Sequence, residues 1–121
     1  GHGLSYTTFE HSDLKITKNG ESFMAEMLVK NTGNVAGAEV VQLYISDINA
    51  SEPRPVKELK QFRKITLSPN EKQKITFEIT GNDLSFFAKK QNKWVVEPGE
   101  FEVLIGSSSK DIRLRKIITL K

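Results

Sequence analysis

The stretch Lys72-Gln73-Lys74-Ile75-Thr76-Phe77-Glu78-Ile79-Thr80 decides the fold class. Gln73, Ile75, Phe77 and Ile79 share one parity, and the lysines, threonines and Glu78 share the other. Successive side chains of a β-strand point to opposite faces, so this period of two predicts a strand with one buried and one solvated face.

The same alternation covers most of the chain and predicts strands over residues 22–30, 38–46, 100–106 and 111–120. Residues 8–17 form a looser strand, whose broken parity predicts a bulge near Glu10-His11-Ser12. Residues 59–67 are also off parity and are interpreted as a bulged strand rather than a helix. The side chains expected on the buried faces are Phe9, Leu14, Ile16, Phe23, Ala25, Met27, Val29, Val41, Leu43, Ile45, Phe101, Val103, Ile105, Ile112, Leu114, Ile118 and Leu120.

Turn residues separate these strands. Asn19-Gly20 is typical of a tight hairpin turn, because both residues tolerate positive φ. Further turn clusters lie at residues 31–34, 68–71, 80–83 and 97–99. Short strands at such spacing indicate an all-β antiparallel sandwich or barrel.

Length and composition limit the number of domains and the kinds of site and partner to be expected. The 121 residues suit one domain, and the absence of cysteine excludes disulfides and thiolate metal sites. The net charge of +3 is weak evidence for an anionic partner, since acidic and basic residues are interspersed. No apolar run approaches the roughly 18 residues of a membrane span, so no membrane partner is expected. The start at Gly1, without methionine, suggests a fragment of a longer chain.

The candidates for chemistry are few. His2 and His11 have no second histidine or carboxylate at ligand spacing, so both are expected to be polar surface histidines and no metal site or cofactor is predicted. The aspartates lie in turns or at polar strand positions, where solvation is the default, and no catalytic dyad is expected among the carboxylates. No serine lies in a nucleophile-elbow context, and residues 106–109 are interpreted as a turn.

The basic and aromatic residues bear on whether the chain binds nucleic acid or sugars. Basic clusters occur at residues 57–64 and 110–116, but the aromatics that would accompany a nucleic-acid groove more often fill a sandwich core, so no nucleic-acid partner is expected. Trp94 and Tyr44 are able to stack on sugar rings if exposed; for Trp94 we favour a core or interdomain anchor. Asn49-Ala50-Ser51 matches the N-glycosylation pattern.

Several stretches, taken in order, resemble the last domain of glycoside hydrolase family 3 enzymes, the β-glucosidases and their relatives. They are residues 1–9 (GHGLSYTTF), 29–44 (VKNTGNVAGAEVVQLY), 54–62 (RPVKELKQF), 67–71 (LSPNE), 94–99 (WVVEPG) and 101–108 (FEVLIGSS). The resemblance covers essentially the whole chain.

The resemblance implies a two-sheet antiparallel sandwich similar to fibronectin type III and immunoglobulin domains. It divides the chain into a tether, residues 1–8, from a preceding domain and a sandwich, residues 9–121. In that family the catalytic aspartate and the acid/base glutamate lie in the preceding domains, so the resemblance implies that neither is in this chain. Residues 12–14 and 46–48 share only the first two letters of the Ser-Asp-Trp context typical of the nucleophile, and no catalytic role is carried over to them. The implied role is a non-catalytic accessory domain that packs on the catalytic domains, in a periplasmic or secreted enzyme. The alternative is a carbohydrate-binding module that holds oligo- or polysaccharide.

The expected contact edge is the loop 47–57. Its two prolines reduce the entropy lost on docking. A solvated connecting loop is the competing interpretation. The candidate contact residues, whether for a neighbouring domain or for a ligand, are Arg54, Pro55, Lys57, Lys60 and Trp94.

Overall fold

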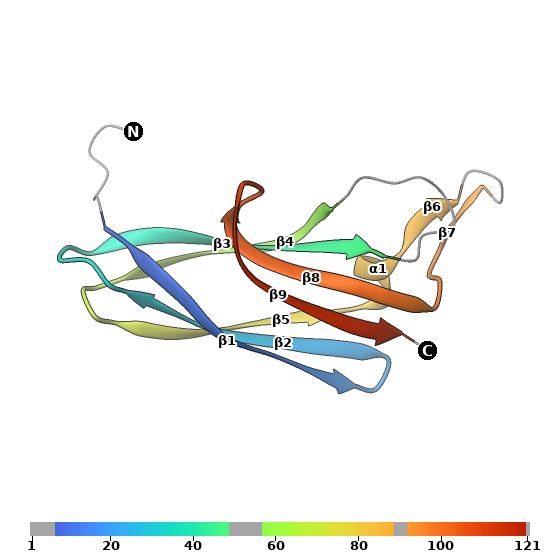
Figure 1. The fold of residues 1–121 in the computed structure, drawn as a ribbon, viewed down its shortest axis with the longest axis horizontal. Coiled ribbons are helices and arrows are strands. Elements are labelled where there is room, and N and C mark those ends of the chain that lie inside the picture. Colours follow the sequence, from blue (N-terminus) through green and yellow to red (C-terminus); the bar gives the residue numbers. More distant parts are fainter. Residues whose placement is uncertain (1–6, 49–56, 89–91, 121) are drawn as a thin grey trace.

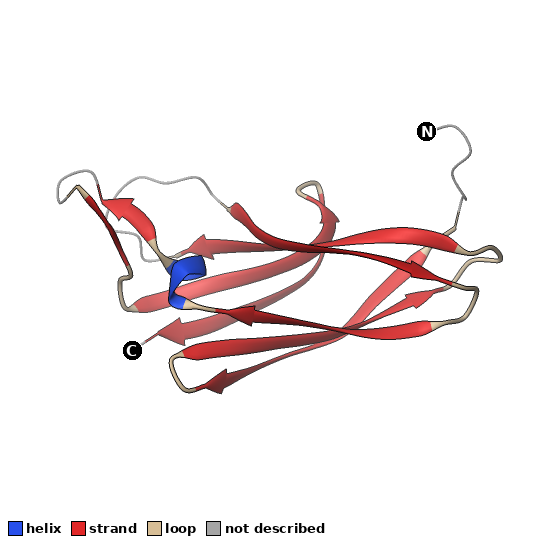
Figure 2. Cartoon of the chain, turned by 180° about the vertical axis from the view of Figure 1, so that it is seen from behind, coloured by secondary structure: helices blue, strands red, loops and turns tan. Residues whose placement is uncertain are grey.

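The computed structural model describes residues 7–48, 57–88 and 92–120, with only the backbone of 86–88. Two antiparallel sheets stack face to face (Figures 1 and 2). One has the strand order β1-β2-β5 and the other β4-β3-β8-β9, with a small β6-β7 hairpin beside them. The elements are β1 (Phe9–Asn19), β2 (Ser22–Asn31), β3 (Gly37–Asp47), β4 (Glu58–Leu67), β5 (Lys72–Ile79), α1 (Gly81–Leu84), β6 (Phe86–Ala88), β7 (Lys93–Val95), β8 (Gly99–Ser108) and β9 (Asp111–Leu120). The predicted all-β sandwich is confirmed.

The core lies between the two sheets and is built by the predicted parity. In β5, Ile75, Phe77 and Ile79 are buried, while Gln73 at the start of the strand is exposed. The other fully buried strand positions come from β2, β3, β4 and β8, as the alternation requires. Phe9, Leu14, Ile16, Leu114 and Leu120 pack against this core from the outer strands β1 and β9.

Both predicted bulges exist. The β1–β2 register shifts between Ser12 and Lys15, and Asp13 has a φ of 56°, so the first bulge lies slightly later than the predicted site at residues 10–12. In β4, the register with β3 passes from Gln61 to Leu59 and skips Lys60, which is the second bulge. The hairpin turn after Asn19 is also present, with Gly20 at a φ of 65°.

Side chains close the two open edges of the sandwich. At one edge, the Arg63 guanidinium lies 5.5 Å from the centre of the Phe77 ring, and Gln61 Nε2 donates to the carbonyl of Glu78 at 2.7 Å. At the other edge, Arg113 donates to the carbonyl of Phe9, and Lys116 Nζ lies 3.4 Å from the carbonyl of Leu14. These contacts join strands of different sheets, whereas backbone hydrogen bonds between strands join only neighbours within one sheet.

Two segments differ from their sequence interpretation or fall outside the structure. Residues 80–83, expected as a turn, begin the short helix α1, because Asp83 Oδ2 accepts a hydrogen bond from the backbone N–H of Thr80 at 3.0 Å and closes a capping box. The proline-braced part of the predicted loop, residues 49–56, lies outside the described residues, as does Asn49.

Candidate functional site

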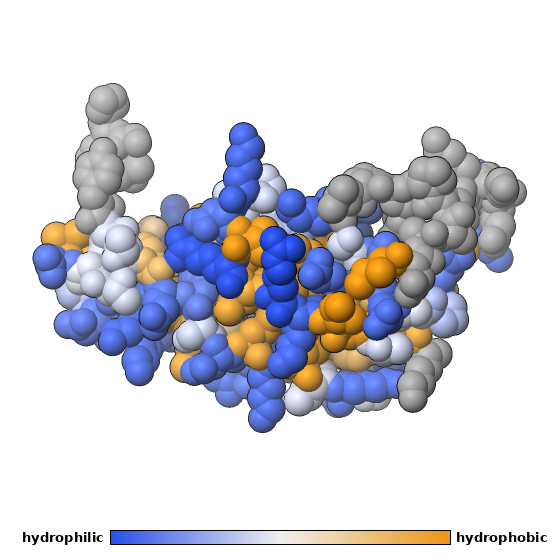
Figure 3. Space-filling model, in the orientation of Figure 1, coloured by the Kyte–Doolittle hydropathy of each residue, from blue (hydrophilic) through white to orange (hydrophobic). Residues whose placement is uncertain are grey.

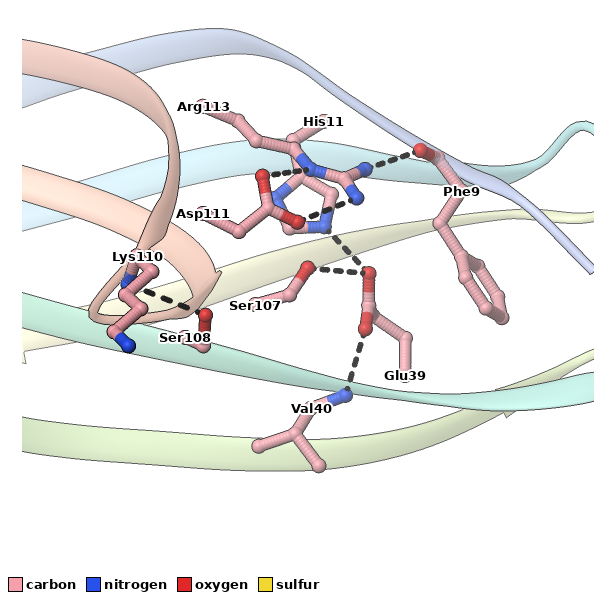
Figure 4. Close-up of polar contacts among 9 residues, drawn as sticks. All are labelled: Phe9, His11, Glu39, Val40, Ser107, Ser108, Lys110, Asp111 and Arg113. Carbon is pink, nitrogen blue, oxygen red and sulfur yellow. Dashed lines mark hydrogen bonds and ion pairs between the residues drawn. The ribbon is translucent and has the colours of Figure 1, made fainter. Parts of the chain in front are cut away.

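Three polar side chains meet on the inner faces of the sandwich: His11 from β1, Glu39 from β3 and Ser107 from β8 (Figure 4). Strand parity places them there. His11 follows Phe9 by two residues, Glu39 precedes Val41 by two, and Ser107 follows Ile105 by two. Each continues the inward row of its strand at one end, and so brings a polar group to the edge of the core.

Glu39 is the centre of this cluster. Its Oε2 accepts hydrogen bonds from His11 Nε2 and from Ser107 Oγ, both at 3.0 Å. Its Oε1 accepts the backbone N–H of Val40 at 3.1 Å. The prediction that His11 is a surface histidine is wrong: its side chain is fully buried against Glu39. The expectation considered only partners at ligand spacing along the chain, whereas Glu39, which pairs with His11 Nε2, lies 28 residues away in the sequence.

Opposing effects act on the pKa of Glu39. Burial raises the pKa of this carboxyl, but hydrogen bonds from His11 and Ser107, with the charges of His11 and Arg113, outweigh burial and hold the pKa below its usual value of 4.5. The ionised carboxylate is therefore favoured in the folded protein.

A second ion pair flanks the cluster at the start of β9. Arg113 binds Asp111 through two nitrogens, at 3.2 and 3.0 Å, and also donates to the carbonyl of Phe9 (Figure 4). The hydrogen bond from Arg113 is the main cause that lowers the pKa of Asp111, and the same bond raises the pKa of Arg113. The pair ties the β8–β9 hairpin to β1.

The cluster is not built for nucleophilic catalysis. A nucleophilic serine needs an imidazole beside it to take its proton. Here the carboxylate stands between Ser107 and His11, and both donate to it. Within the described residues, no group of three histidine, aspartate or glutamate side chains is arranged to hold a metal ion. The arrangement serves as a buried junction between the two sheets.

A second candidate site lies at the opposite end of the sandwich from the β2–β3 loop, where the β6–β7 hairpin projects (Figure 1). Trp94 is 66% exposed, so the half of the prediction that placed it in the core is wrong. It lines a shallow pocket with Asn82 of α1 and Ser85. Ser85 Oγ donates to the carbonyl of Asn82 at 2.8 Å. Tyr44, the other aromatic considered for sugar stacking, is buried and donates to Gln42.

Of the remaining candidate contact residues, only Lys57 and Lys60 are described, and both lie near the start of β4. Arg54 and Pro55 lie outside the described residues. Lys57 is half-buried just before β4. Lys60, at the bulge, has a side chain only 16% exposed, and its Nζ lies 3.5 Å from Glu58. The predicted contact set therefore stays a prediction.

Comparison with known proteins assigns the family. The model of the fibronectin type III-like domain matches residues 39–109, which is more than half of the chain. The chain belongs to the fibronectin type III-like domain family. This assignment agrees with the strand orders β1-β2-β5 and β4-β3-β8-β9.

The relatives of this fibronectin type III-like domain are much longer proteins. It is 52% identical over 117 residues to β-glucosidase BoGH3A of Bacteroides ovatus, a match that covers 93% of this chain and 16% of that protein. Thermostable β-glucosidase B of Acetivibrio thermocellus is 43% identical over 122 residues, again with 16% of its length covered. The crystal structure of a GH3 β-glucosidase from Bifidobacterium adolescentis superposes with a TM-score of 0.91 at 39% identity and is covered over 18% of its chain.

The chain thus spans about one-sixth of the relatives it matches, and it resembles the fibronectin type III-like part of glycoside hydrolase family 3 β-glucosidases. In the part of the chain that the structure describes, no helix is long and apolar enough to cross a membrane.

Proposed function

We propose that this chain is a non-catalytic accessory domain of a β-glucosidase-like hydrolase, which packs on the catalytic domains of its own polypeptide and stabilises them. One observation carries the proposal. The match covers 93–98% of this chain but only 16% of two β-glucosidases, which leaves most of each enzyme outside this fold.

The chemistry of the buried cluster supports a structural role. Glu39, the one glutamate in the buried core of the described residues, has its Oε2 shared between His11 and Ser107 and its Oε1 bound to a backbone N–H. A general acid or nucleophile in glycoside hydrolysis needs a second carboxyl across a space that admits the sugar. Around Glu39 the neighbouring groups are hydrogen-bond donors that compensate its charge, not a second carboxyl.

Thermal inactivation tests the stabilising role. The longer enzyme would be compared with a version that ends before residue 9, by following aryl β-glucoside hydrolysis after heating. We expect the truncated enzyme to lose activity at least tenfold faster at an elevated temperature, because removal of a packed domain exposes the apolar surface beneath it. Equal inactivation rates for both enzymes would contradict the proposal.

A carbohydrate-binding module is the second candidate function, and the exposed indole of Trp94 favours it. An aromatic ring beside the amide of Asn82 and the hydroxyl of Ser85 is the kind of surface that stacks on a sugar and hydrogen-bonds its hydroxyls. Titration of the 121-residue chain with soluble β-glucan, followed by tryptophan fluorescence, tests it. A saturable shift that is lost in Trp94→Ala supports the module, and no shift at millimolar sugar counts against it.

A further inference from the structure

The two outer faces of the sandwich differ in character. In the sheet β1-β2-β5, the outward side chains of β5 are lysine, threonine and glutamate, and Lys74 pairs with Glu26 of β2 at 2.9 Å. None of the large hydrophobic side chains that are exposed among the described residues lies in β1, β2 or β5. Met24 and Leu28 of β2 also face outward but are half-buried, so this sheet exposes mainly polar side chains, as is usual for an antiparallel sandwich.

The sheet β4-β3-β8-β9 carries apolar residues on its outer face. The register pairs Leu59 with Tyr44, and Tyr44 with Leu104, so these three cross the sheet as one row. Phe62 is paired with Gln42 in the next outward row, and Ile117 with Glu102 in the row beyond Leu104. We call these five residues, Tyr44, Leu59, Phe62, Leu104 and Ile117, the apolar face.

The apolar face has a covered centre and exposed flanks. Tyr44 and Leu104 are only 7% and 4% exposed although they point away from the core, whereas Phe62 is 67%, Ile117 54% and Leu59 48% exposed. An ion pair lies between Leu104 and Ile117, where the register places Arg115 beside Leu104 and Glu102 beside Ile117, with Arg115 4.0 Å from Glu102. In the space-filling view, apolar surface also gathers between long hydrophilic side chains over β8 and β9 (Figure 3). An apolar centre with a polar rim is the anatomy of a protein interface.

We infer that the apolar face is the surface through which this domain docks on the remainder of its own polypeptide. The inference rests on the proposed function, which supplies the tethered partner. In the β-glucosidases that it matches, the region similar to this domain makes up 16–18% of one chain. The rest of that chain is covalently linked to the domain. A tethered partner needs less contact area than a free one, because the tether supplies a high effective concentration.

Other occupants fit the apolar face less well. Three exposed side chains fall short of the roughly 800 Å² per partner that a stable untethered dimer buries. A glycan would need hydrogen-bonding groups beside an aromatic ring. Phe62 is the exposed aromatic ring of this face, but the Tyr44 hydroxyl is buried and engaged by Gln42, and the two other exposed members, Leu59 and Ile117, offer only aliphatic surface.

Hydrogen–deuterium exchange, measured on the 121-residue chain and on the longer enzyme, tests the inference. We expect amides of β4 and of the adjoining part of β3 to exchange at least tenfold more slowly in the longer enzyme, while β1 and β2 exchange alike in both. In the longer enzyme, Phe62→Ser should abolish the difference, whereas Met24→Ser, on the outer face of the other sheet, should leave it unchanged.

The outcomes separate the inference from the function on which it rests. Identical exchange at every peptide would overturn both. Added protection confined to β1, β2 and β5 would overturn the inference and leave the proposed function standing. Concentration-dependent dimers of the 121-residue chain that Phe62→Ser dissociates would assign the apolar face to a second copy. Protection of β4 by soluble β-glucan, without protection in the longer enzyme, would assign it to a glycan.

Discussion

Glu39 shows how a single charge is made compatible with a sandwich interior. Its carboxylate accepts from His11, Ser107 and the backbone of Val40, so three donors replace the water that burial removes. These donors come from three strands of both sheets. The residue therefore acts as a junction whose strength depends on the carboxyl remaining ionised.

Stability should depend on pH through Glu39. Its pKa in the folded protein is lower than the usual 4.5, so the stabilisation is present above that value and is lost as the pH falls through the lower, folded pKa. Glu39→Gln should cost about 2 kcal/mol at pH 7 and flatten the acid limb of a urea-unfolding series. Glu26→Gln, at the exposed pair with Lys74, is the control and should change little. An acid limb that is unchanged in Glu39→Gln would contradict this account.

Glycine is required at position 106 because there is no room for a Cβ atom, and not because of its backbone flexibility. A Cβ built there would lie 2.1 Å from the carbonyl oxygen of Asp111 and 2.8 Å from the Cα of Ile112, both backbone atoms that cannot rotate away. Gly106→Ala should therefore destabilise the domain by about 2 kcal/mol or more in chemical denaturation. Gly20→Asn, at a positive φ with nothing within 4 Å, should shift stability by about 0.5 kcal/mol or less. Equal effects of the two substitutions would contradict the crowding at Gly106.

Parity predicts a residue's face better than its chemical type does. Extending the inward row of β3 from Val41 to residue 39, or that of β1 from Phe9 to residue 11, points both side chains inward. The surface assignment of His11 followed instead from the lack of a second histidine or carboxylate at ligand spacing. What the sequence could not show is the partnership itself, because Glu39 lies 28 residues from His11 and 68 from Ser107. Only the stacking of the two sheets brings them together.

At the scale of elements, Asn31 joins two turns. This fully buried side chain donates from Nδ2 to the carbonyls of Val35 and Leu67, at 2.9 and 3.0 Å, and its Oδ1 accepts from Thr7 and from the backbone of Gly33. The loop after β2 and the turn after β4 are thereby held against each other. A buried amide suits this place because it supplies donors and an acceptor at once.

Asn31→Asp should destabilise this junction by about 3 kcal/mol, because a carboxylate would face the carbonyls of Val35 and Leu67 where an N–H₂ group now donates. Urea unfolding measures the cost, and hydrogen exchange should show faster opening around residues 65–70. Asn19→Asp, at the exposed end of β1, adds the same charge as a control. A wild-type unfolding midpoint for Asn31→Asp would contradict the role of the amide.

Elements with a long apolar alternation were predictable, and short ones were not. The strands β2, β3, β5 and β8 follow from their parity, and the skipped Lys60 confirms the bulge expected in β4. The helix α1 was missed because four residues carry no periodicity, and its cap depends on the Asp83 side chain. The exposure of Trp94 depends on where the β6–β7 hairpin projects, which local sequence does not determine.

At the scale of the whole molecule, the domain is a closed sandwich with an asymmetric exterior. Its interior is closed at both edges by side chains such as Arg63 and Arg113. Among the described residues, no large hydrophobic side chain is exposed in β1, β2 or β5, whereas the other sheet carries the apolar face. We propose that the apolar face is where the domain docks on the rest of its polypeptide, as argued above.

Hydrolysis of an aryl β-glucoside by the purified 121-residue chain tests the central claim most directly. The accessory-domain account predicts no release of the aryl alcohol above the buffer rate at any pH from 4 to 8, while the longer enzyme turns the substrate over. Turnover by the 121-residue chain that is lost in Asp13→Ala or Asp47→Ala, with the fold retained by circular dichroism, would contradict it.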